Sequence, residues 1–206
     1  MKKSTKDKII EAAIHEFASK GYEQATTRDI LLAAGANVAA INYYFKGKQG
    51  LYVEVLMHIV EVVRKRFRDL YPQYLVLKAT MPNPQKSKEM LKTSIRTFVE
   101  LMSSDEFSLD LTMIYVREYT QPSPYYETLS DLNKTCFSWF TTLLKDASEG
   151  VLSEKQANLQ AVMLYSQMFT IFTRKKVILR AMGWKDYDEE ALSEILSVIY
   201  RNIRID

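Results

Sequence analysis

The 206-residue sequence contains a single cysteine, Cys136, and only two histidines, His15 and His58. One thiol excludes an intramolecular disulfide and a cysteine-rich metal site. Six glycines and five prolines are few for a chain with many tight turns, which favours long helices. No stretch approaches the roughly 18–20 uncharged apolar residues that span a bilayer, and the N-terminus lacks the unbroken apolar core of a signal peptide. We therefore expect a cytoplasmic protein.

Sequence motifs that carry catalysis are missing as well. The chain has no Gly-rich phosphate loop and no Gly-x-Ser-x-Gly turn. Neither histidine has a nearby cysteine or a Glu-x-x-His partner, which are the arrangements that bind zinc. We therefore expect no enzymatic activity, no metal site and no cofactor.

Charge is unevenly distributed along the chain. Residues 1–70 hold twelve Lys or Arg against eight Asp or Glu, whereas residues 71–206 hold sixteen against seventeen. The excess is small, yet it indicates that a polyanion would be met by the N-terminal third.

Helical periodicity runs through almost the whole sequence and predicts an all-α protein of nine helices. The first stripe ends near Gly21, and Thr26 with Asp29 three residues later resembles a capping box that opens a second helix. In the third, short helix Val38, Ile41 and Phe45 share one face, which we expect to be buried. Residues 48–70 are predicted to form one long helix.

Prolines mark the best candidate boundary, between Tyr71 and Gln85. Beyond it, further apolar stripes predict helices, of which one opens at Ser153 and runs to about Arg180 and the last is capped by Asp188. We expect three parts: an N-terminal domain at 1–48, a connector helix at 49–71, and a larger helical domain at 72–206.

The segment from Thr26 to Phe45 has the proportions of a helix-turn-helix, two short helices joined by three residues. If the apolar face of its second helix is buried, the opposite face carries small side chains, an amide and two phenols in place of the usual Lys and Glu. Such a face suits close approach to a DNA groove, because an amide can pair with adenine and phenols can reach phosphates. The alternatives to DNA contacts are that residues 26–29 serve only as a helix cap and that Tyr43 and Tyr44 are half-buried aromatics.

The first 50 residues resemble the TetR/AcrR family of bacterial repressors. The matching strings are FASKGY (17–22), ATTRDI (25–30), AGA (34–36), INYYFKGK (41–48) and LY (51–52). The run NVAAINYYF (37–45), with Arg117-Glu118 and the later Pro122-Ser123-Pro124, resembles the CecR-type subgroup. Asn42 departs from the pattern, since many members carry Tyr there, so base preference cannot be transferred.

The resemblance implies a role for each matching position of this chain. The implied DNA contacts are phosphate contacts by Thr27 and Arg28, major-groove contacts by Asn37, Ala39, Ala40 and Asn42, backbone contacts by Tyr43 and Tyr44, and an added positive charge from Lys48.

The resemblance also implies that residues 1–48 are the helix-turn-helix DNA-binding domain and that residues 72–206 form the effector-binding and dimerisation domain of a homodimer. A helix-turn-helix domain of this size covers one half-site, so we expect a palindromic operator. Apolar stripes on the last two helices predict the dimer interface, namely Leu159, Val162, Phe169, Leu192, Ile195, Leu196 and Ile199. Aromatic and methionine side chains suit an adaptable, mostly apolar effector pocket, namely Phe98, Met102, Tyr115, Tyr119, Trp139 and Met168. Ordinary core packing is the alternative for both sets.

These patterns predict a DNA-binding transcriptional regulator, a repressor that a small effector releases from its operator. A helical partner-binding protein with only nonspecific DNA affinity is the alternative. The two differ in whether a selected DNA pool yields a palindrome.

Overall fold

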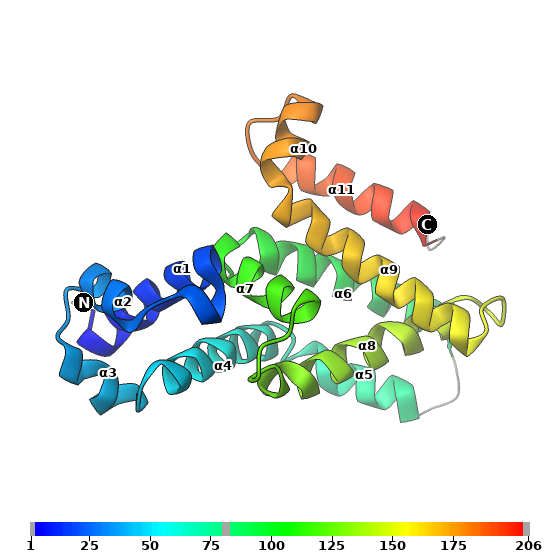
Figure 1. Cartoon of the computed structure of the whole chain (residues 1–206). Helices are drawn as coiled ribbons and strands as arrows, with labels where there is room; N and C mark the ends of the chain where they lie inside the picture. The colour runs from blue at the N-terminus through cyan, green and yellow to red at the C-terminus, as the bar shows by residue number, and fades with distance from the viewer. Residues whose placement is uncertain (1–2, 80–82, 204–206) are drawn as a thin grey trace. The chain divides into compact units, whose positions relative to one another are not determined.

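The computed structural model describes residues 3–79 and 83–203, and this part of the chain forms eleven helices and no strand (Figure 1). The helices are α1 (Thr5–Gln24), α2 (Thr27–Ala34), α3 (Val38–Phe45), α4 (Lys48–Arg66), α5 (Leu70–Ala79), α6 (Pro84–Ser103), α7 (Leu109–Thr120), α8 (Glu127–Ala147), α9 (Glu154–Thr173), α10 (Lys175–Met182) and α11 (Glu189–Asn202). None of the helices in these residues is long and apolar enough to cross a bilayer.

The all-α prediction is confirmed, but the predicted number of nine helices is wrong. The first difference lies in residues 48–70, which were predicted to form a single helix. That helix ends at Arg66, and a separate helix, α5, runs from Leu70 to Ala79 and so covers much of the Tyr71–Gln85 stretch that was predicted to be a boundary. Pro72 explains the break, because a proline lacks the N–H that would bond to residue 68 and its ring clashes with that carbonyl. In the first turn of a new helix, where N–H groups have no intrahelical partner, the same proline is tolerated.

The second extra helix arises at Arg174, where the helix expected to continue to about residue 180 is interrupted. Arg174 has φ −109° and ψ 18°, and α10 starts at the next residue. Just before the break, the hydroxyls of Thr170 and Thr173 donate to the carbonyls of Ser166 and Phe169, at 2.8 and 3.0 Å. Such bonds from threonine to the preceding turn weaken and bend helices.

The chain divides into two compact units, and each is considered by itself. The N-terminal unit comprises Met1–Val62 and Phe107–Asp131, and the C-terminal unit comprises Val63–Glu106 and Leu132–Asp206. Residues 107–131 fall in the N-terminal unit because α7 packs against α1.

The N-terminal unit is built on α1, which packs against α2, α3 and α7. Its core consists of apolar side chains from these helices and α4, each at most 5% exposed, including Ile9, Phe17, Ile30, Ile41, Phe45, Leu51, Val55 and Ile114. A small apolar core from five helices therefore supports the short helices α2 and α3.

In the C-terminal unit, α6 packs against α5, α9 and α11. The core again comes from helical stripes, with Leu91, Ile95, Leu143, Ala157, Ala161, Leu164, Met168 and Ile199 at most 2% exposed. Tyr200 ties the last helix to α6, because its hydroxyl donates to the carbonyl of Lys92 at 3.1 Å.

Candidate nucleic-acid interface

Helices α2 and α3 are joined by the three residues 35–37 and have a defined cap at each end of that turn. Helix α2 starts at Thr26, whose side chain accepts from the Asp29 amide at 3.1 Å. It ends at Gly35 in the left-handed conformation, with φ 61° and ψ 38°. Asn37 caps α3 by accepting from the Ala40 amide at 3.1 Å. The local sequence thus fixes both helix ends, as expected of a helix-turn-helix.

The buried face of α3 is narrower than the sequence predicts. Ile41 and Phe45 are 3% and 5% exposed, as expected, but Val38 is 74% exposed, so the prediction that it faces the core is wrong. Val38 is the first residue of α3, where the cap by Asn37 rather than burial holds the first turn.

The opposite face of α3 is open to solvent, as predicted. Ala39 and Asn42 are exposed, Ala40 is partly exposed, and Tyr43 and Tyr44 are 75% and 42% exposed. The two phenol rings meet edge to face at 4.8 Å, a favourable aromatic geometry. This surface consists of small side chains, one amide and two phenols.

Residues at the start of α2 border this face. Arg28 is exposed and Thr27 is half-buried. Asp29 is neutralised by Lys20, whose ammonium lies 3.0 Å from the carboxylate, and this bond holds the pKa of Asp29 below its usual range. Because Lys20 already neutralises Asp29, this carboxylate does not offset the positive charge of Arg28.

Two of the predicted DNA contacts also have partners inside the protein. The Oδ1 atom of Asn37 accepts the capping bond of α3, which leaves its amide nitrogen and one oxygen lone pair for DNA. Lys48 donates to the carbonyl of Glu23 at 3.1 Å, and its ammonium lies 4.5 Å from the ring centre of Tyr22. Replacing Lys48 would therefore weaken the end of α1 as well as remove a charge.

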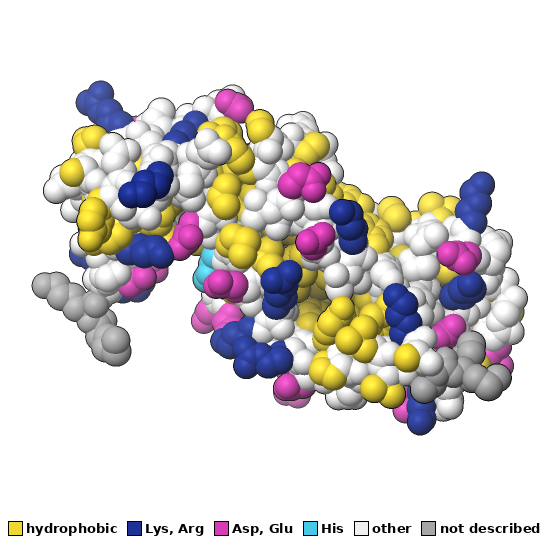
Figure 2. Space-filling model, turned by 90° about the horizontal axis from the view of Figure 1, so that it is seen from below, with side chains coloured by type: hydrophobic (Ala, Val, Ile, Leu, Met, Phe, Trp, Pro, Cys, Tyr) yellow, Lys and Arg dark blue, Asp and Glu magenta, His cyan; other side chains and the backbone are white. Residues whose placement is uncertain are grey.

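On the one face drawn in Figure 2, charge does not mark an interface. On the face drawn in Figure 2, Lys and Arg side chains are interspersed with Asp and Glu rather than gathered in one patch. The residue types on α3, not an excess of positive charge, single out the candidate surface.

The residues predicted to line an effector pocket lie mostly in packed surroundings. Trp139 stacks on Tyr74 at 4.7 Å and donates to Ser94 at 3.1 Å, and Phe98 contacts Phe169 edge to face at 5.3 Å. Met102 and Met168 are buried too, whereas Tyr115 and the exposed Tyr119 belong to the N-terminal unit.

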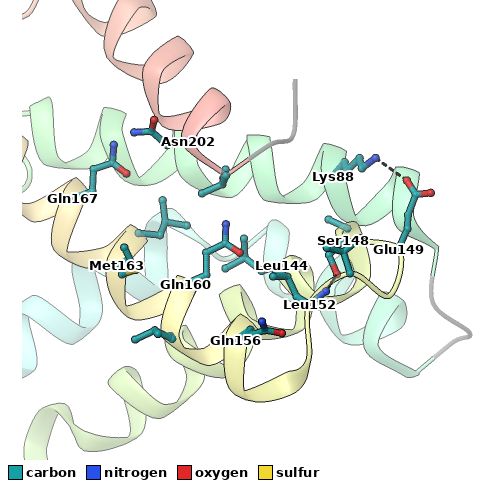
Figure 3. A pocket seen from close by; sticks show the side chains of 15 residues that line it. Lys88, Leu144, Ser148, Glu149, Leu152, Gln156, Gln160, Met163, Gln167 and Asn202 are labelled. Carbon is teal, nitrogen blue, oxygen red and sulfur yellow. Dashed lines mark hydrogen bonds and ion pairs between the residues drawn. The ribbon is translucent and has the colours of Figure 1, made fainter.

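A pocket of about 990 Å³ opens elsewhere in the C-terminal unit (Figure 3). None of the six predicted effector residues lines it. It lies among the start of α6, the end of α8, residues 156–167 of α9 and the end of α11, with Leu144, Leu152 and Met163 among its apolar residues. Sequence periodicity missed it because its lining comes from four separate segments.

Charge in this pocket is balanced and its polar groups are mainly amides. Lys88 is the one basic side chain among the described residues of the lining, and it pairs with Glu149 at 2.8 Å. Gln156, Gln160, Gln167 and Asn202 also line it, and the Oε1 atom of Gln160 is buried without a hydrogen-bond partner among the described residues. A buried acceptor of this kind favours a donor on whatever occupies the pocket.

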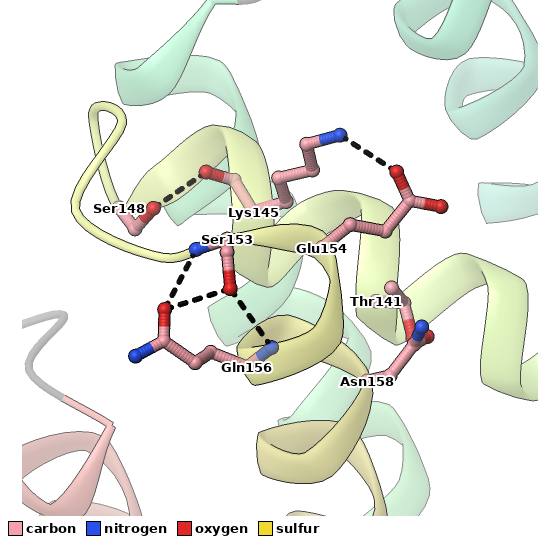
Figure 4. Close-up of polar contacts among 7 residues, drawn as sticks. All are labelled: Thr141, Lys145, Ser148, Ser153, Glu154, Gln156 and Asn158. Carbon is pink, nitrogen blue, oxygen red and sulfur yellow. Dashed lines mark hydrogen bonds and ion pairs between the residues drawn. The ribbon is translucent and has the colours of Figure 1, made fainter.

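The junction of α8 and α9 forms one side of this pocket and is tied by polar contacts (Figure 4). Ser153 and Gln156 form a capping box at the predicted start of this helix. The Gln156 amide donates to Ser153 Oγ at 3.3 Å, and the Ser153 amide donates to Gln156 Oε1 at 2.9 Å. Lys145 pairs with Glu154 at 3.1 Å, and Thr141 donates to Asn158 at 2.9 Å.

The predicted dimer residues separate into two groups. On α9, Leu159 and Val162 are 62% and 39% exposed, and Phe169 is half-buried. On α11, Leu192 is half-buried, but the remaining three lie within the chain's own core, with Ile195, Leu196 and Ile199 at 8%, 3% and 1% exposure. The face of α9 is thus the part of the predicted interface that is available to a partner.

Two family models match the sequence. The model of bacterial regulatory proteins of the tetR family covers residues 9–55, which include α2 and α3. The model of the C-terminal domain of the HTH-type transcriptional dual regulator CecR covers residues 87–206, more than half of the chain. The chain belongs to the TetR family of transcriptional regulators. The TetR resemblance is confirmed, and with it the CecR-like relationship.

Individual TetR-family relatives agree with this assignment. The HTH-type transcriptional dual regulator CecR of Shigella flexneri is 28% identical over 188 residues, which are 90% of this chain and 83% of that protein. The probable HTH-type transcriptional regulator YttP of Bacillus subtilis is 37% identical over 120 residues, 58% of this chain and 53% of its own length.

Among solved structures, AibR in complex with isovaleryl coenzyme A and operator DNA has a TM-score of 0.67 at 12% identity, with 96% of this chain and 97% of that chain covered. This likeness shows the fold. The family assignment makes α2 and α3 the helix-turn-helix of a DNA-binding transcription regulator.

Among the described residues, no group of three or more His, Cys, Asp or Glu side chains is placed to hold a metal ion. The relatives reported above are transcription regulators rather than enzymes.

Proposed function

We propose that this TetR-family protein is a repressor that binds a palindromic operator as a homodimer and leaves it when a small, mostly apolar effector binds. The observation that carries the DNA-binding part is the exposed face of α3, where Asn42, Tyr43 and Tyr44 surround small alanines. Small groups let the helix approach the groove, Asn42 pairs with a base edge, and the phenols bond to the backbone.

Phosphate contacts then come from the start of α2. Arg28 is exposed there, and the N-terminal amides of α2 favour a phosphate nearby. Further phosphate contacts come from the half-buried Thr27 and from Lys48, which also donates to the carbonyl of Glu23. These contacts fix register and carry no sequence information.

A homodimer follows from the size of the reading surface. One helix of eight residues covers a single half-site, so high affinity needs two copies whose α3 helices enter successive major grooves. The exposed apolar side chains of α9 support this dimer, because Leu159 and Val162 share a helix face without being used by the chain's own core.

The effector part of the proposal rests on the pocket of about 990 Å³ in the C-terminal unit, within the usual size of ligand sites. Among its described lining residues the one basic side chain, Lys88, is paired with Glu149, so the pocket favours an uncharged polar group, and Gln160 favours one that donates a hydrogen bond. The AibR structure, which holds both a coenzyme A thioester and operator DNA, supports a regulator of this fold that responds to a small molecule.

Release requires the effector to prefer the form that does not bind DNA. Shifting a two-state equilibrium from 1:99 to 99:1 takes about 5.5 kcal/mol of preference. In this chain both α4 and α8 start in the N-terminal unit and end in the C-terminal unit. We propose that the shift passes through α4, because α4 begins directly after α3.

Selection of bound duplexes from a random DNA pool tests the proposed function. The full chain should enrich a palindrome whose half-site centres lie one helical turn or more apart, because each half-site receives one α3. Enrichment of a single unrepeated site would contradict the homodimer. No enrichment above nonspecific binding would instead favour the partner-binding alternative.

A further inference from the structure

Two adjacent residues of α7, Arg117 and Glu118, contact the helices beneath the helix-turn-helix without lying on the DNA surface. Arg117 Nη1 donates to the carbonyl of Phe17 in α1 at 2.8 Å. Helix α1 is interrupted just after this point, at Gly21, which has φ 77° and ψ 170°. A Cβ at residue 21 would lie 2.9 Å from Arg117 Nη1. The glycine thus leaves room for a guanidinium at the end of a helical segment, where a cation is favoured.

Glu118 is 1% exposed and its two carboxylate oxygens are both used. Oε1 accepts from the Tyr52 hydroxyl of α4 at 2.6 Å. Oε2 accepts from the amide and the hydroxyl of Ser123, at 3.2 and 3.1 Å. A buried carboxylate is costly unless such donors satisfy it, so this geometry links α4, α7 and the segment that follows α7.

Tyrosines add a third link within the N-terminal unit. The hydroxyls of Tyr22 and Tyr125 lie 3.1 Å apart, and their rings meet edge to face at 4.9 Å. Tyr52 lies 4.9 Å from Tyr22 and 6.1 Å from Tyr125 between ring centres. Burial and the hydrogen bond to Tyr125 raise the pKa of Tyr22 to about 12. The segment after α7 is therefore fastened to α1 and α4 by packing as well as by hydrogen bonds.

We propose that Arg117 and Glu118 are positioning residues for operator binding, which fasten α7 to α1 and α4 and so hold the helix-turn-helix in place. The chain passes between its two units three times, at residues 62/63, 106/107 and 131/132. While α7 stays attached, all three connections hold the helix-turn-helix. Once it detaches, only the connection through α4 remains.

This inference rests on the proposed homodimer, because positioning matters when two helix-turn-helix motifs must meet two half-sites at once. Loose attachment spreads each motif over more orientations and lowers the effective concentration of the second motif at its half-site. Binding to one half-site does not require this alignment. A loss of affinity for the duplex with two half-sites, without a loss for the duplex with one, therefore reports a defect in positioning rather than in the DNA-contacting surface.

The experiment compares Tyr52→Phe, Glu118→Gln and the double variant of the full chain, well below their unfolding temperatures. The probes are the selected palindromic duplex and a duplex with one half-site. We expect Tyr52→Phe to weaken palindrome binding about tenfold, as for one hydrogen bond to a charged group, and to leave half-site binding unchanged. The double variant should lose less than the product of the single losses. Tyr74→Phe is the control, since this 2% exposed tyrosine of the C-terminal unit loses only a 3.4 Å contact with Ser138.

A lower unfolding temperature with both affinities unchanged would overturn the proposal, and so would equal losses on both duplexes. Hydrogen exchange provides a readout that does not depend on DNA. Tyr52→Phe should speed amide exchange about tenfold in α7 and in residues 121–125, with α9 unchanged. If wild-type protein shows no preference for two half-sites, the homodimer fails, and unchanged exchange in α7 then overturns the positioning role by itself.

Discussion

Gly50→Ala should destabilise the N-terminal unit by about 3 kcal/mol and abolish operator binding at temperatures where the variant is partly unfolded. Gly50 lies in the first turn of α4, and a Cβ there would lie 1.8 Å from the carbonyl oxygen of Phe45. Because that atom belongs to the backbone at the end of α3, the two helices must separate to relieve the clash. Chemical denaturation monitored by circular dichroism gives the loss directly.

The sign of this effect opposes helix propensity, which favours Ala over Gly by roughly 0.5–1 kcal/mol inside a helix. Gln49→Ala is the matched control, since it changes an exposed neighbour in the same turn. We expect the control to stay within about 0.5 kcal/mol of wild type. A Gly50→Ala protein as stable as wild type would mean that the α3–α4 junction is looser than described.

Val162→Asp should convert the dimer to monomers and weaken palindrome binding by about 100-fold or more, because the second half-site is no longer reached intramolecularly. Val162 is 39% exposed on α9, so an aspartate there is solvated in the monomer and desolvated in the dimer. Sedimentation measures the association state, and titration of the palindromic duplex measures the affinity.

Val76→Asp is the corresponding control, because Val76 is 65% exposed on α5, a helix outside the proposed interface. It should remain dimeric and bind DNA as wild type does. If the Val162→Asp variant still forms dimers, with the same dependence of association on protein concentration as wild type, the interface does not lie on this face of α9.

Local signals made most of the helix-turn-helix predictable. Thr26, Gly35 and Asn37 sit at the helix ends where their capping chemistry belongs, and Ile41 with Phe45 marks the buried face of α3. The prediction for Val38 was wrong because helical periodicity assumes that every residue of an apolar stripe is buried. In α3 the first residue of the stripe is exposed, and only Ile41 and Phe45 are buried.

Breaks within long apolar stretches were harder to predict. Pro72 was visible in the sequence and was interpreted as a loop, yet it stands in the first turn of α5. At Arg174 no proline or glycine marks the end of α9, and the bonds from Thr170 and Thr173 to their own helix only favour a bend there.

Contacts distant in sequence could not be predicted from one chain. Tyr52 and Glu118 are 66 positions apart, and Arg117 bonds a carbonyl 100 positions away. The same holds for the pocket, whose residues range from Lys88 to Ile203. The same limit applies to the predicted dimer residues on α11, of which Ile195, Leu196 and Ile199 are buried within the chain. An apolar stripe does not show whether it faces its own core or a second copy.

The most direct test of the central claim, that the open face of α3 reads bases, is the affinity of Asn42→Ala for the selected operator and for each of its single-base variants. We predict a loss of about 1–3 kcal/mol that disappears on operators altered at the base pair that Asn42 reads. Arg28→Ala, measured beside it, should weaken all duplexes alike and reduce the salt slope by about one. A uniform loss for Asn42→Ala, or no loss, would contradict base reading by α3.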